Sequence, residues 1–427
     1  MSALNIPESN LKRVVIIGGG FGGLKILNQI SSKYYQVVLI DKNNYHNFQP
    51  LLYQVATSGL EPDSIAYPLR KILWKKSEFY FRNTKAIRID SENKRLVTEA
   101  GLIDYDFLVI ATGSKTNYFG NKVIEEKSIA LKSVTDALNL RSLILENCEA
   151  SLLTSDLEER ERLMNYVVVG GGPTGVELSG ALAELKKHVL PKDYPDLDLR
   201  RMNVHLVEAT DTLLGTMGPK AGEKAKEYLT EMGVNVWLNT KVEDFDGSTV
   251  KTDNKELPSK TLIWAAGVSG NLIDGIDSKS IERGRILVDQ YNRVEGYEEI
   301  FCIGDVCLMK SDENPNGDPM VAQTAIQQGG LLAKNLNNFA KGEEMKPFSY
   351  SDKGSMATIG RNKAVAEVGS FFFDGILAWL VWMFVHLMAL VGFRNRVVAL
   401  INWTQNYITY DKGIRLIIRP FKNREKD

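Results

Sequence analysis

The chain carries two copies of one glycine-rich motif, and this duplication limits its fold more than any other feature. Residues 14–23 read VVIIGGGFGG, and residues 167–175 read VVVGGGPTG. In each copy a β-branched apolar run ends in G-x-G-x-x-G, which is typical of a buried parallel strand that turns into a helix. The amide groups at the start of such a helix hold a pyrophosphate. Two motifs therefore predict two dinucleotides and electron transfer between them.

A carboxylate ends the strand expected after each motif. Asp41 lies 18 positions after Gly23 (41 minus 23), close to the spacing of about 20 that is usual for a residue that binds a ribose hydroxyl. Glu208 lies 33 positions after Gly175 (208 minus 175), and a long helix and loop through 186–201 would account for the excess. A charge at Glu208 would repel a 2′-phosphate, which favours NADH over NADPH. Ordinary hydrated strand ends are the alternative for both carboxylates.

Three further apolar strands end in small residues, at the sheet edge where open α/β folds bind ligands. Their ends are 111–113 (Ala-Thr-Gly), 265–267 (Ala-Ala-Gly) and 303–305 (Ile-Gly-Asp). Strand and helix signals alternate from Arg13 to about Asn335, which predicts an α/β fold with two Rossmann-like domains. The charged stretch 156–162 is interpreted as the solvated end of a helix before the second motif.

Composition excludes several classes of function. The chain has 427 residues, of which 44% are hydrophobic, enough for two or three domains with a sizeable core. A net charge of −1 gives no field that would attract nucleic acid. Three cysteines and four scattered histidines predict neither a disulfide framework nor a metal centre. Cys302 and Cys307 are interpreted as buried thiols, with a redox pair as the alternative. The N-terminus lacks a signal-peptide core, so we expect the body of the protein in a reducing cytosol.

The C-terminal part has a different character. Residues 375–393 contain no formal charge and are rich in Leu, Val, Trp, Met and Phe. From Arg394 to Asp427 there are eight Lys/Arg against three Asp/Glu, an excess of five. A basic, Trp-bearing apolar segment is suited to an anionic membrane surface, where each cation adds about 1 kcal/mol. We expect a monotopic anchor here; a transmembrane span and a buried core or dimer-interface helix are the alternatives.

Taken in order, these motifs resemble the two-dinucleotide-binding flavoproteins from about Arg13 to Asn335. Within that family the chain resembles the type II NADH:quinone oxidoreductases, the non-pumping respiratory NADH dehydrogenases. Three segments carry this narrower resemblance: 49–56 (QPLLYQVA) beside the flavin, 322–329 (AQTAIQQG) as a quinone-site helix, and 378–403 as a membrane-binding region. The region 45–56 has no cysteine, which disfavours a dithiol reductase, and the three cysteines do not match the pattern of sulfide:quinone reductases.

The resemblance implies non-covalent FAD at the first motif and NADH as substrate at the second. The residues implied at FAD are Gly18, Gly20, Phe21, Gly22, Gly23, Asp41, Lys42, Gln54, Ala111, Thr112, Gly113, Gly304, Asp305 and Ala322. The residues implied at NADH are Gly170, Gly172, Pro173, Thr174, Gly175, Glu208, Ala266 and Gly267. Asp305 would reach the ribityl or phosphate side of the flavin, with helix capping as its rival role.

The implied catalytic residues are Glu177, Gln323 and Gln327. Glu177 would lie in the first turn of its helix, point toward the flavin and help to position the nicotinamide; a carboxylate that only stabilises a helix N-terminus is the alternative. Gln323 and Gln327 are four apart and share a helix face, and Gln323 is the better candidate for the quinone head group. A merely hydrated helix face is the alternative. Tyr53 and 376–382 are candidates for the lining of the quinone tunnel, with ordinary packing as the alternative.

The predicted domains are 1–118 and 271–345 for FAD, 119–270 for NADH and 346–427 for membrane anchoring. The predicted function is FAD-dependent oxidation of NADH with two-electron reduction of menaquinone or ubiquinone, without proton pumping, at the cytoplasmic face of the inner membrane. The partners are a quinone and a lipid surface, and a homodimer stays open. The alternatives are a soluble FAD-dependent reductase of a protein electron carrier, a sulfide:quinone-type oxidoreductase and a non-enzymatic NADH sensor.

Overall fold

The fold is seen in a computed structural model that describes residues 2–418 except 75, 313, 412 and 414. Contacts divide the chain into two compact units. Unit 1 consists of Met1–His46, Tyr67–Lys115 and Val268–Asp352, and unit 2 of Asn47–Ala66, Thr116–Gly267 and Lys353–Asp427. The sequence did not separate Asn47–Ala66 from its neighbours, and the predicted four-part domain division stays a prediction. Four short strands lie near the points where the chain changes unit: β3 (Tyr45–Asn47), β4 (Ala66–Pro68), β10 (Ser114–Thr116) and β19 (Val268–Gly270).

Unit 1 is built on a five-stranded parallel sheet with the order β22-β9-β1-β2-β5. Its strands are β1 (Lys12–Ile17), β2 (Tyr35–Asp41), β5 (Phe79–Asn83), β9 (Phe107–Ile110) and β22 (Ile300–Cys302). The chain starts in the middle, moves to one edge through β2 and β5, and returns to the other side of β1 with β9. The strand order therefore reverses between β1 and β9, and this is the point where such sheets bind ligands.

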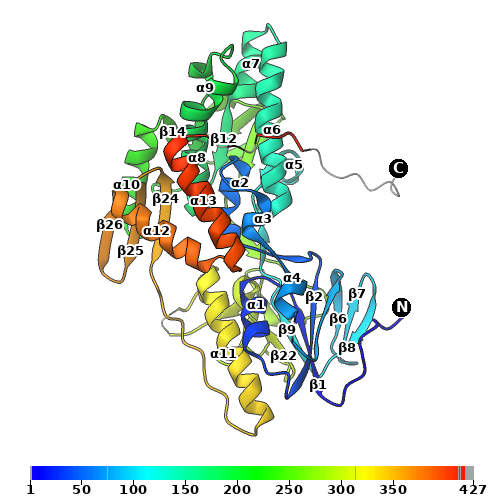
Figure 1. The fold of residues 1–427 in the computed structure, drawn as a ribbon. Coiled ribbons are helices and arrows are strands. Elements are labelled where there is room, and N and C mark those ends of the chain that lie inside the picture. Colours follow the sequence, from blue (N-terminus) through cyan, green and yellow to red (C-terminus); the bar gives the residue numbers. More distant parts are fainter. Residues whose placement is uncertain (1, 75, 313, 412, 414, 419–427) are drawn as a thin grey trace. The chain divides into compact units, whose positions relative to one another are not determined.

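Both faces of this sheet are covered, which explains the unbroken apolar run in β1. Val14 and Ile16 pack with α1 (Phe21–Gln29) and α11 (Ala322–Ala340), which lie side by side in Figure 1. Val15 and Ile17 face the opposite way, toward two small three-stranded sheets. These are β6 (Ala86–Asp90), β7 (Arg95–Thr98) and β8 (Gly101–Asp104), and β20 (Ile281–Glu282), β21 (Arg285–Val288) and β23 (Cys307–Met309). The short α4 (Leu69–Leu73) completes the helices of unit 1 among the residues described.

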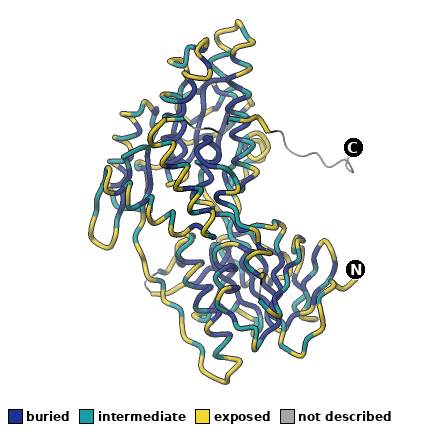
Figure 2. Tube along the Cα trace, in the orientation of Figure 1, coloured by how far each residue is buried: buried dark blue, intermediate teal, exposed yellow. Residues whose placement is uncertain are grey.

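Unit 2 repeats the same architecture around the second motif. Its parallel sheet has the order β11-β18-β12-β13-β14, and the order reverses between β12 and β18. The strands are β11 (Ile129–Ala130), β12 (Tyr166–Val169), β13 (Val204–Val207), β14 (Val234–Trp237) and β18 (Thr261–Trp264). A small antiparallel sheet follows, with β15 (Val242–Phe245), β16 (Thr249–Thr252) and β17 (Glu256–Pro258). Strands β9, β12, β13 and β18 of the two central sheets are buried along their whole length, and Figure 2 shows dark blue segments inside each unit.

The helices of unit 2 explain the late position of Glu208. Helix α8 (Pro173–Glu184) continues into a π-helical turn (Leu185–Val189), then α9 (Leu190–Asp193) and a 3₁₀ turn (Leu199–Arg201) before β13. The predicted long helix and loop between the motif and Glu208 is therefore confirmed. The other helices are α2 (Leu52–Ala56), α3 (Pro62–Ile65), α5 (Lys122–Lys127), α6 (Val134–Leu153), α7 (Leu157–Met164) and α10 (Pro219–Glu231).

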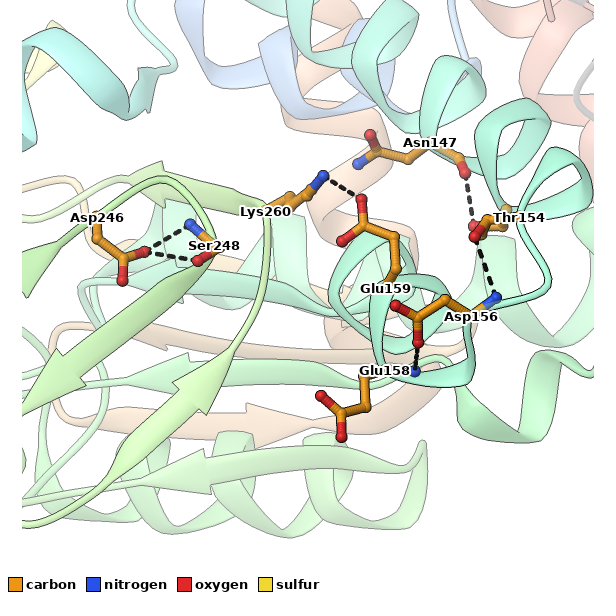
Figure 3. A network of polar contacts seen from close by, with 9 residues as sticks. Asn147, Thr154, Asp156, Glu158, Glu159, Asp246, Ser248 and Lys260 are labelled. Carbon is orange, nitrogen blue, oxygen red and sulfur yellow. Dashed lines mark hydrogen bonds and ion pairs between the residues drawn. The ribbon is translucent and has the colours of Figure 1, made fainter.

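The charged stretch before the second motif begins a helix, so its interpretation as a helix end was wrong. Asp156 is the N-cap of α7, and its carboxylate accepts from the amide of Glu158 at 3.0 Å. Glu159, one residue further, pairs with Lys260 beside β18, as Figure 3 shows. The signal was a capping residue followed by two acidic residues in the first turn, which is typical of a helix start.

The C-terminal part of unit 2 is an antiparallel sheet with two helices. Its elements are β24 (Ser355–Gly360), β25 (Lys363–Val368), β26 (Phe371–Asp374), α12 (Gly375–Ala389) and α13 (Phe393–Thr409). Figure 1 shows α12 across this sheet, in agreement with the contacts of α12 with β25. The sheet packs on α8, where a Cβ on Gly180 would lie 1.6 Å from the carbonyl oxygen of Ile359. Only glycine permits such close packing of strand and helix backbones.

Candidate active site

The first glycine turn has the close backbone packing that a dinucleotide site needs. Gly18 has φ +105°, and a Cβ there would lie 2.3 Å from the carbonyl oxygen of Ala111 at the end of β9. A Cβ on Gly23 would lie 1.9 Å from the carbonyl oxygen of Gly18, so α1 can start only if this residue is glycine. No atom lies within 4 Å of a Cβ built on Gly20. The second glycine of the motif therefore leaves open the space where a pyrophosphate approaches the helix.

The strand-end carboxylate lies beside this turn. Asp41 accepts hydrogen bonds from the amides of Gly19 (2.6 Å) and Asn43 (2.7 Å). Burial raises the pKa of Asp41, while these two amides and the charge of Lys42 lower it to a smaller extent. Asp41 therefore lies next to the glycine loop, and its predicted role at a ribose stays a prediction.

Several of the other predicted flavin-side residues lie at the carboxyl ends of strands in the same sheet, whereas Gln54 falls in α2 of unit 2. Gly113 has φ +70° with open space above it, and Thr112 donates to the carbonyl of Asn271 at 2.6 Å. Asp305 accepts from the hydroxyl of Ser114 at 2.6 Å. It lies in the short turn Gly304–Val306, and α11 begins only at Ala322 with Val321 as its N-cap, so capping of α11 is not its role. Phe21 begins α1, and Gly22 packs so closely on α11 that a Cβ on Gly329 would lie 2.5 Å from its carbonyl oxygen.

The second glycine turn matches the first almost atom for atom. Gly170 has φ +109°, and a Cβ there would lie 2.8 Å from the backbone of Ala265 and Ala266. A Cβ on Gly175 would lie 1.9 Å from the carbonyl oxygen of Gly170, and the space at Gly172 is open. Pro173 and Thr174 begin α8. The two turns therefore offer the same kind of phosphate site.

Glu208 has the place in unit 2 that Asp41 has in unit 1. It accepts from the amide of Gly171 at 2.6 Å and from the amide of Thr210 at 2.8 Å. Gly267, at the end of β18, has φ +73°, and a Cβ there would lie 2.7 Å from the ring of Phe119. Phe119 is 69% exposed, and its ring stands edge-on to Trp264 at 6.5 Å. No motif in the sequence predicted that Phe119 would lie beside Gly267.

Glu177 lies in the second turn of α8, and its predicted place in the first turn was wrong. The helix starts at Pro173, so Glu177 is its fifth residue. The side chain is buried, and burial raises the pKa of Glu177 to about 8 from 4.5. The amide of Thr358, 3.4 Å from the carboxyl oxygen, and the indole of Trp382 oppose this rise. A carboxyl with this pKa is mostly protonated at neutral pH, so it does not act as a charge at a helix N-terminus.

Glu177 borders a pocket that lies entirely within unit 2. Its walls come from α2, from α8 and the π-helical turn, from β24, and from α12 and α13. The lining residues are Tyr53, Gln54, Thr57, Gly59, Glu177, Ala181, Glu184, His188, Val189, Thr358, Ile359, Gly360, Arg361, Trp379, Trp382, Met383, Trp403, Asn406, Tyr407 and Tyr410. Six of these twenty are Trp or Tyr, so the pocket suits a flat conjugated ring.

Three of the lining residues are joined by hydrogen bonds. The indole Nε1 of Trp403 donates to Oε1 of Gln54 at 2.7 Å. The amide Nε2 of Gln54 donates to the hydroxyl oxygen of Tyr53 at 2.9 Å. Tyr53 and Trp403 are buried, and burial raises the pKa of the Tyr53 hydroxyl well above 10, with the nearby carboxyl of Glu177 as the second cause.

Helix α11 carries three glutamines, Gln323, Gln327 and Gln328, which differ in burial and in hydrogen-bond partners. Gln323 and Gln327 lie on one side of the helix and are half-buried. The amide of Gln327 is bound at both ends by the backbone of Ser351, donating to its carbonyl at 2.8 Å and accepting from its amide at 3.0 Å. Gln328, which the sequence analysis missed, is buried and accepts from the amide of Gly304 at 2.8 Å. It therefore supports the Gly304–Asp305 turn from inside unit 1.

Helices α12 and α13 carry a continuous set of exposed apolar side chains, here called the apolar patch. On α12, two adjacent residues are followed by others at intervals of three or four positions, so all of them fall on one face. They are Ile376, Leu377, Leu380, Phe384 and Met388 on α12, and Phe393, Val397, Leu400, Ile401 and Ile408 on α13. The inner faces of the two helices bury Ala378, Trp382, Ala399 and Trp403. In the part of the chain that the structure describes, no helix has the length and apolar character to span a bilayer. Most of the basic tail, from residue 419, lies outside the described residues.

Cys148 lies on α6, Cys302 ends β22 and Cys307 begins β23. All three are buried, and burial raises the pKa of the Cys148 thiol to about 12 and that of Cys302 well above 9. Cys302 lies next to Cys307, which reinforces the rise. Thiols in this state are poor nucleophiles. The described residues include no group of His, Cys, Asp and Glu that would hold a metal ion.

Two Rossmann-type turns on one chain, each with a strand-end carboxylate that accepts from an amide of the turn, define a two-dinucleotide oxidoreductase fold. The family model described as pyridine nucleotide-disulphide oxidoreductase matches residues 12–329, and the model described as NDH2 C-terminal domain matches residues 353–410. The chain is 37% identical to the type II NADH:quinone oxidoreductase Ndh of Mycobacterium tuberculosis, over 94% of this chain and 89% of that protein. It is 30% identical to the internal alternative NAD(P)H-ubiquinone oxidoreductase A1 of Arabidopsis thaliana, over 94% and 85%.

The chain belongs to the type II NADH:quinone oxidoreductase family. A solved structure of NDH2 from Plasmodium falciparum in complex with NADH has the same fold, with a TM-score of 0.88, 23% identity and coverage of 96% and 100%. The sulfide:quinone oxidoreductase of Aquifex aeolicus shares the fold more loosely, at a TM-score of 0.70 and 19% identity. The predicted fold class, flavin-dependent oxidoreductase class, cofactor and quinone acceptor are therefore confirmed.

Proposed function

We propose that unit 1 holds FAD non-covalently on the turn Gly18–Gly23, with Asp41 on the adenosine ribose. The open space at Gly20 and Gly113 and the adjacent carboxylate support this assignment. Ala111 and Thr112 pack beside the turn, and Asp305, held by Ser114, supplies a polar group at the same edge. When bound, FAD accepts a hydride from NADH and passes two electrons to a quinone. The chain's own task is to align the reactants and exclude water.

NADH is assigned to the turn Gly170–Gly175 at the start of α8, with Glu208 on its ribose. The amide groups and the dipole of α8 favour the pyrophosphate there. Glu208 would lie where a 2′-phosphate would add a second negative charge, which is the basis for a preference for NADH over NADPH. Ala266 and Gly267 keep the side chains small just after β18, and the exposed ring of Phe119 lies beside Gly267 at this point.

The aromatic pocket of unit 2 is assigned to the quinone. Its aromatic walls suit the ring, and the buried, mostly protonated carboxyl of Glu177 can hold a proton beside a carbonyl oxygen without placing a charge in an apolar site. Gln323 of unit 1 is kept as a candidate for binding the quinone head group because segment 322–329 matches the pattern of the family's quinone-site helix. Menaquinone and ubiquinone both fit this chemistry.

The apolar patch is assigned to the surface of an inner membrane, at the cytoplasmic face where NADH is available. Lipid contact would cover side chains that are more than a third exposed to water, and a quinone dissolved in the bilayer would then have a short path to α12 and α13. The resulting function is oxidation of NADH and reduction of a membrane quinone without proton pumping. A homodimer that covers the patch is the competing assignment.

The main observation behind this proposal is the pair of matching glycine turns. The experiment that tests it measures flavin reduction by NADH separately from flavin reoxidation by a quinone. The purified protein is expected to be yellow, and in stopped-flow mixing NADH bleaches the flavin, which menaquinone-1 or ubiquinone-1 then restores. Gln323→Ala should slow the second step and leave the first unchanged. The matched control is Gln290→Ala, an exposed glutamine outside α11. A colourless protein that takes up no FAD would refute the proposal, and equal loss in both steps would refute the role of Gln323.

A further inference from the structure

The hydrogen bonds Trp403–Gln54–Tyr53 run in only one possible direction. An indole nitrogen can donate but cannot accept, so the atom of Gln54 that faces Trp403 must be the carbonyl oxygen. The amide NH₂ of Gln54 then has to face Tyr53, and it donates to the hydroxyl oxygen. Trp403 therefore fixes which way the amide of Gln54 points, although Trp403 and Gln54 come from α13 and α2 and are 349 positions apart.

This direction decides what the hydroxyl of Tyr53 can do. Its oxygen already accepts a hydrogen bond from Gln54, so its own O–H remains to donate to another group. If Gln54 were turned over, its carbonyl would face Tyr53 and capture that proton. The pocket wall would then lose a donor at this point.

We propose that Trp403 and Gln54 are positioning residues that hold the hydroxyl of Tyr53 as a hydrogen-bond donor to a carbonyl oxygen of the quinone. This inference rests on the proposed assignment of the pocket to the quinone. Tyr53 is a binding residue, whereas Trp403 and Gln54 act through it. A quinone carbonyl is an acceptor only, so it needs a donor in this wall. The O–H of Tyr53 can donate to it, because the oxygen of that hydroxyl already accepts from one of the two N–H groups of Gln54.

Two further contacts favour this role over ordinary packing. Tyr53 and Glu177 line the same pocket and interact electrostatically, so the hydroxyl lies close to the buried carboxyl. The ring of Trp403 lies 6.0 Å from that of Trp382, which also borders Glu177. The hydroxyl of Tyr53 is therefore linked to Trp403 of α13 through Gln54, and the carboxyl of Glu177 is contacted by Trp382 of α12. These are the two helices that bear the apolar patch.

The first test is a double-mutant cycle read out on the quinone half-reaction. Trp403→Phe keeps an aromatic side chain, though a smaller one, and removes the N–H, and Tyr53→Phe removes the hydroxyl. Each should lower kcat/KM for ubiquinone-1 by about three- to tenfold, the usual effect of one hydrogen bond, and leave flavin reduction by NADH unchanged. The double variant should be no worse than Tyr53→Phe alone, since without the hydroxyl the direction of Gln54 no longer matters. Effects that multiply would overturn the proposal.

The second test uses Gln54→Glu, which keeps the acceptor that Trp403 needs. A carboxylate at position 54 would also accept from Tyr53 and withdraw the donor, whereas a protonated carboxyl would donate as the amide does. The quinone step of Gln54→Glu should therefore fall as pH rises, through an ionisation that the unaltered protein lacks. The other ionisable groups of the pocket are Glu177, Glu184, His188, Arg361, Tyr407 and Tyr410, and the unaltered protein measured in parallel accounts for them. A pH profile parallel to that of the unaltered protein would overturn the proposal.

The matched control is Thr404→Val, next to Trp403 on α13. Its hydroxyl donates to the carbonyl of Leu400 at 2.8 Å on the exposed side of the helix, so the substitution removes a hydrogen bond from α13 without touching Gln54. Flavin content and thermal melting show that each variant is folded. If the unaltered protein reduces no quinone, the proposed function fails; if it does and Trp403→Phe matches Thr404→Val, only this inference fails.

Discussion

Replacing Glu177 by glutamine should change how the stability of the protein depends on pH. In the folded protein burial raises the pKa of Glu177 to about 8, whereas the unfolded chain has the ordinary value of 4.5. Between these two values the folded state keeps a proton that the unfolded state has released. The contribution of Glu177 to the free energy of unfolding therefore falls as pH rises through this window.

The size of this effect follows from the two pKa values. Each pH unit well inside the window costs about 1.36 kcal/mol, and the loss between pH 5 and pH 7 integrates to about 2.5 kcal/mol. Glutamine does not ionise, so Glu177→Gln lacks this loss. The free energy of unfolding of Glu177→Gln, relative to the unaltered protein, should thus rise by about 2.5 kcal/mol from pH 5 to pH 7.

Urea denaturation followed by tryptophan fluorescence, at half-unit steps of pH, measures this difference. A constant offset between the two proteins is irrelevant, because only its change with pH reports on the buried carboxyl. Glu158→Gln, on the exposed side of α7, is the matched control for the conversion of a carboxylate to an amide. Curves for Glu177→Gln and the unaltered protein that stay parallel from pH 5 to pH 7 would refute the reasoning.

Three further outcomes are expected. Gly172→Ala should fold normally, because its Cβ meets no atom within 4 Å, but should raise the KM for NADH on the order of tenfold while flavin content is kept; an unchanged KM would contradict the phosphate site. Glu208→Ser should raise the kcat/KM ratio of NADPH to NADH about tenfold by removing a repulsive charge, and an unaltered ratio would mean that Glu208 does not face the ribose. Leu377→Glu combined with Phe384→Glu should abolish sedimentation with anionic lipid vesicles, whereas Leu153→Glu, 88% exposed on α6, should not; continued sedimentation of the double variant would disprove the membrane assignment of the apolar patch.

The nucleotide turns were predictable because their information is local. In the first copy, a β-branched run, three glycines and a strand-end acid lie within about 30 positions. The first and third glycines of each motif are closely packed, and the second leaves open space. Glu208 was recognised as the acid at the end of the next strand although it lies far beyond the motif. The intervening residues form helical segments, and β13 still follows β12 in the sheet. Gln328 was missed because its neighbours in the helix carried the recognised pattern.

The pocket of unit 2 was not predictable to the same extent because it is assembled from distant segments. Glu177 was recognised, but its burial depends on Thr358, 181 positions away, and no local pattern shows this. Tyr53 was named as a tunnel candidate, yet its link to Trp403 depends on α2 packing in unit 2 together with α13. The sequence showed that the segment of α12 is apolar, but it did not decide whether this segment contacts lipid, the protein core or a second copy of the chain. Its inner face packs on β25, and its outer face stays exposed.

Within three turns, helix α8 contributes to the second glycine turn, to the pocket of unit 2 and to the close packing on β24. Its first turn carries Gly175, its second carries Glu177, and its third carries Gly180, locked against the carbonyl of Ile359 in β24. A helix this short does not bend between these points, so α8 and β24 have to open as one cooperative element. Hydrogen exchange should accordingly give their amides one shared protection factor, and occupancy of the glycine turn by a dinucleotide should slow exchange in β24 as much as in α8 itself.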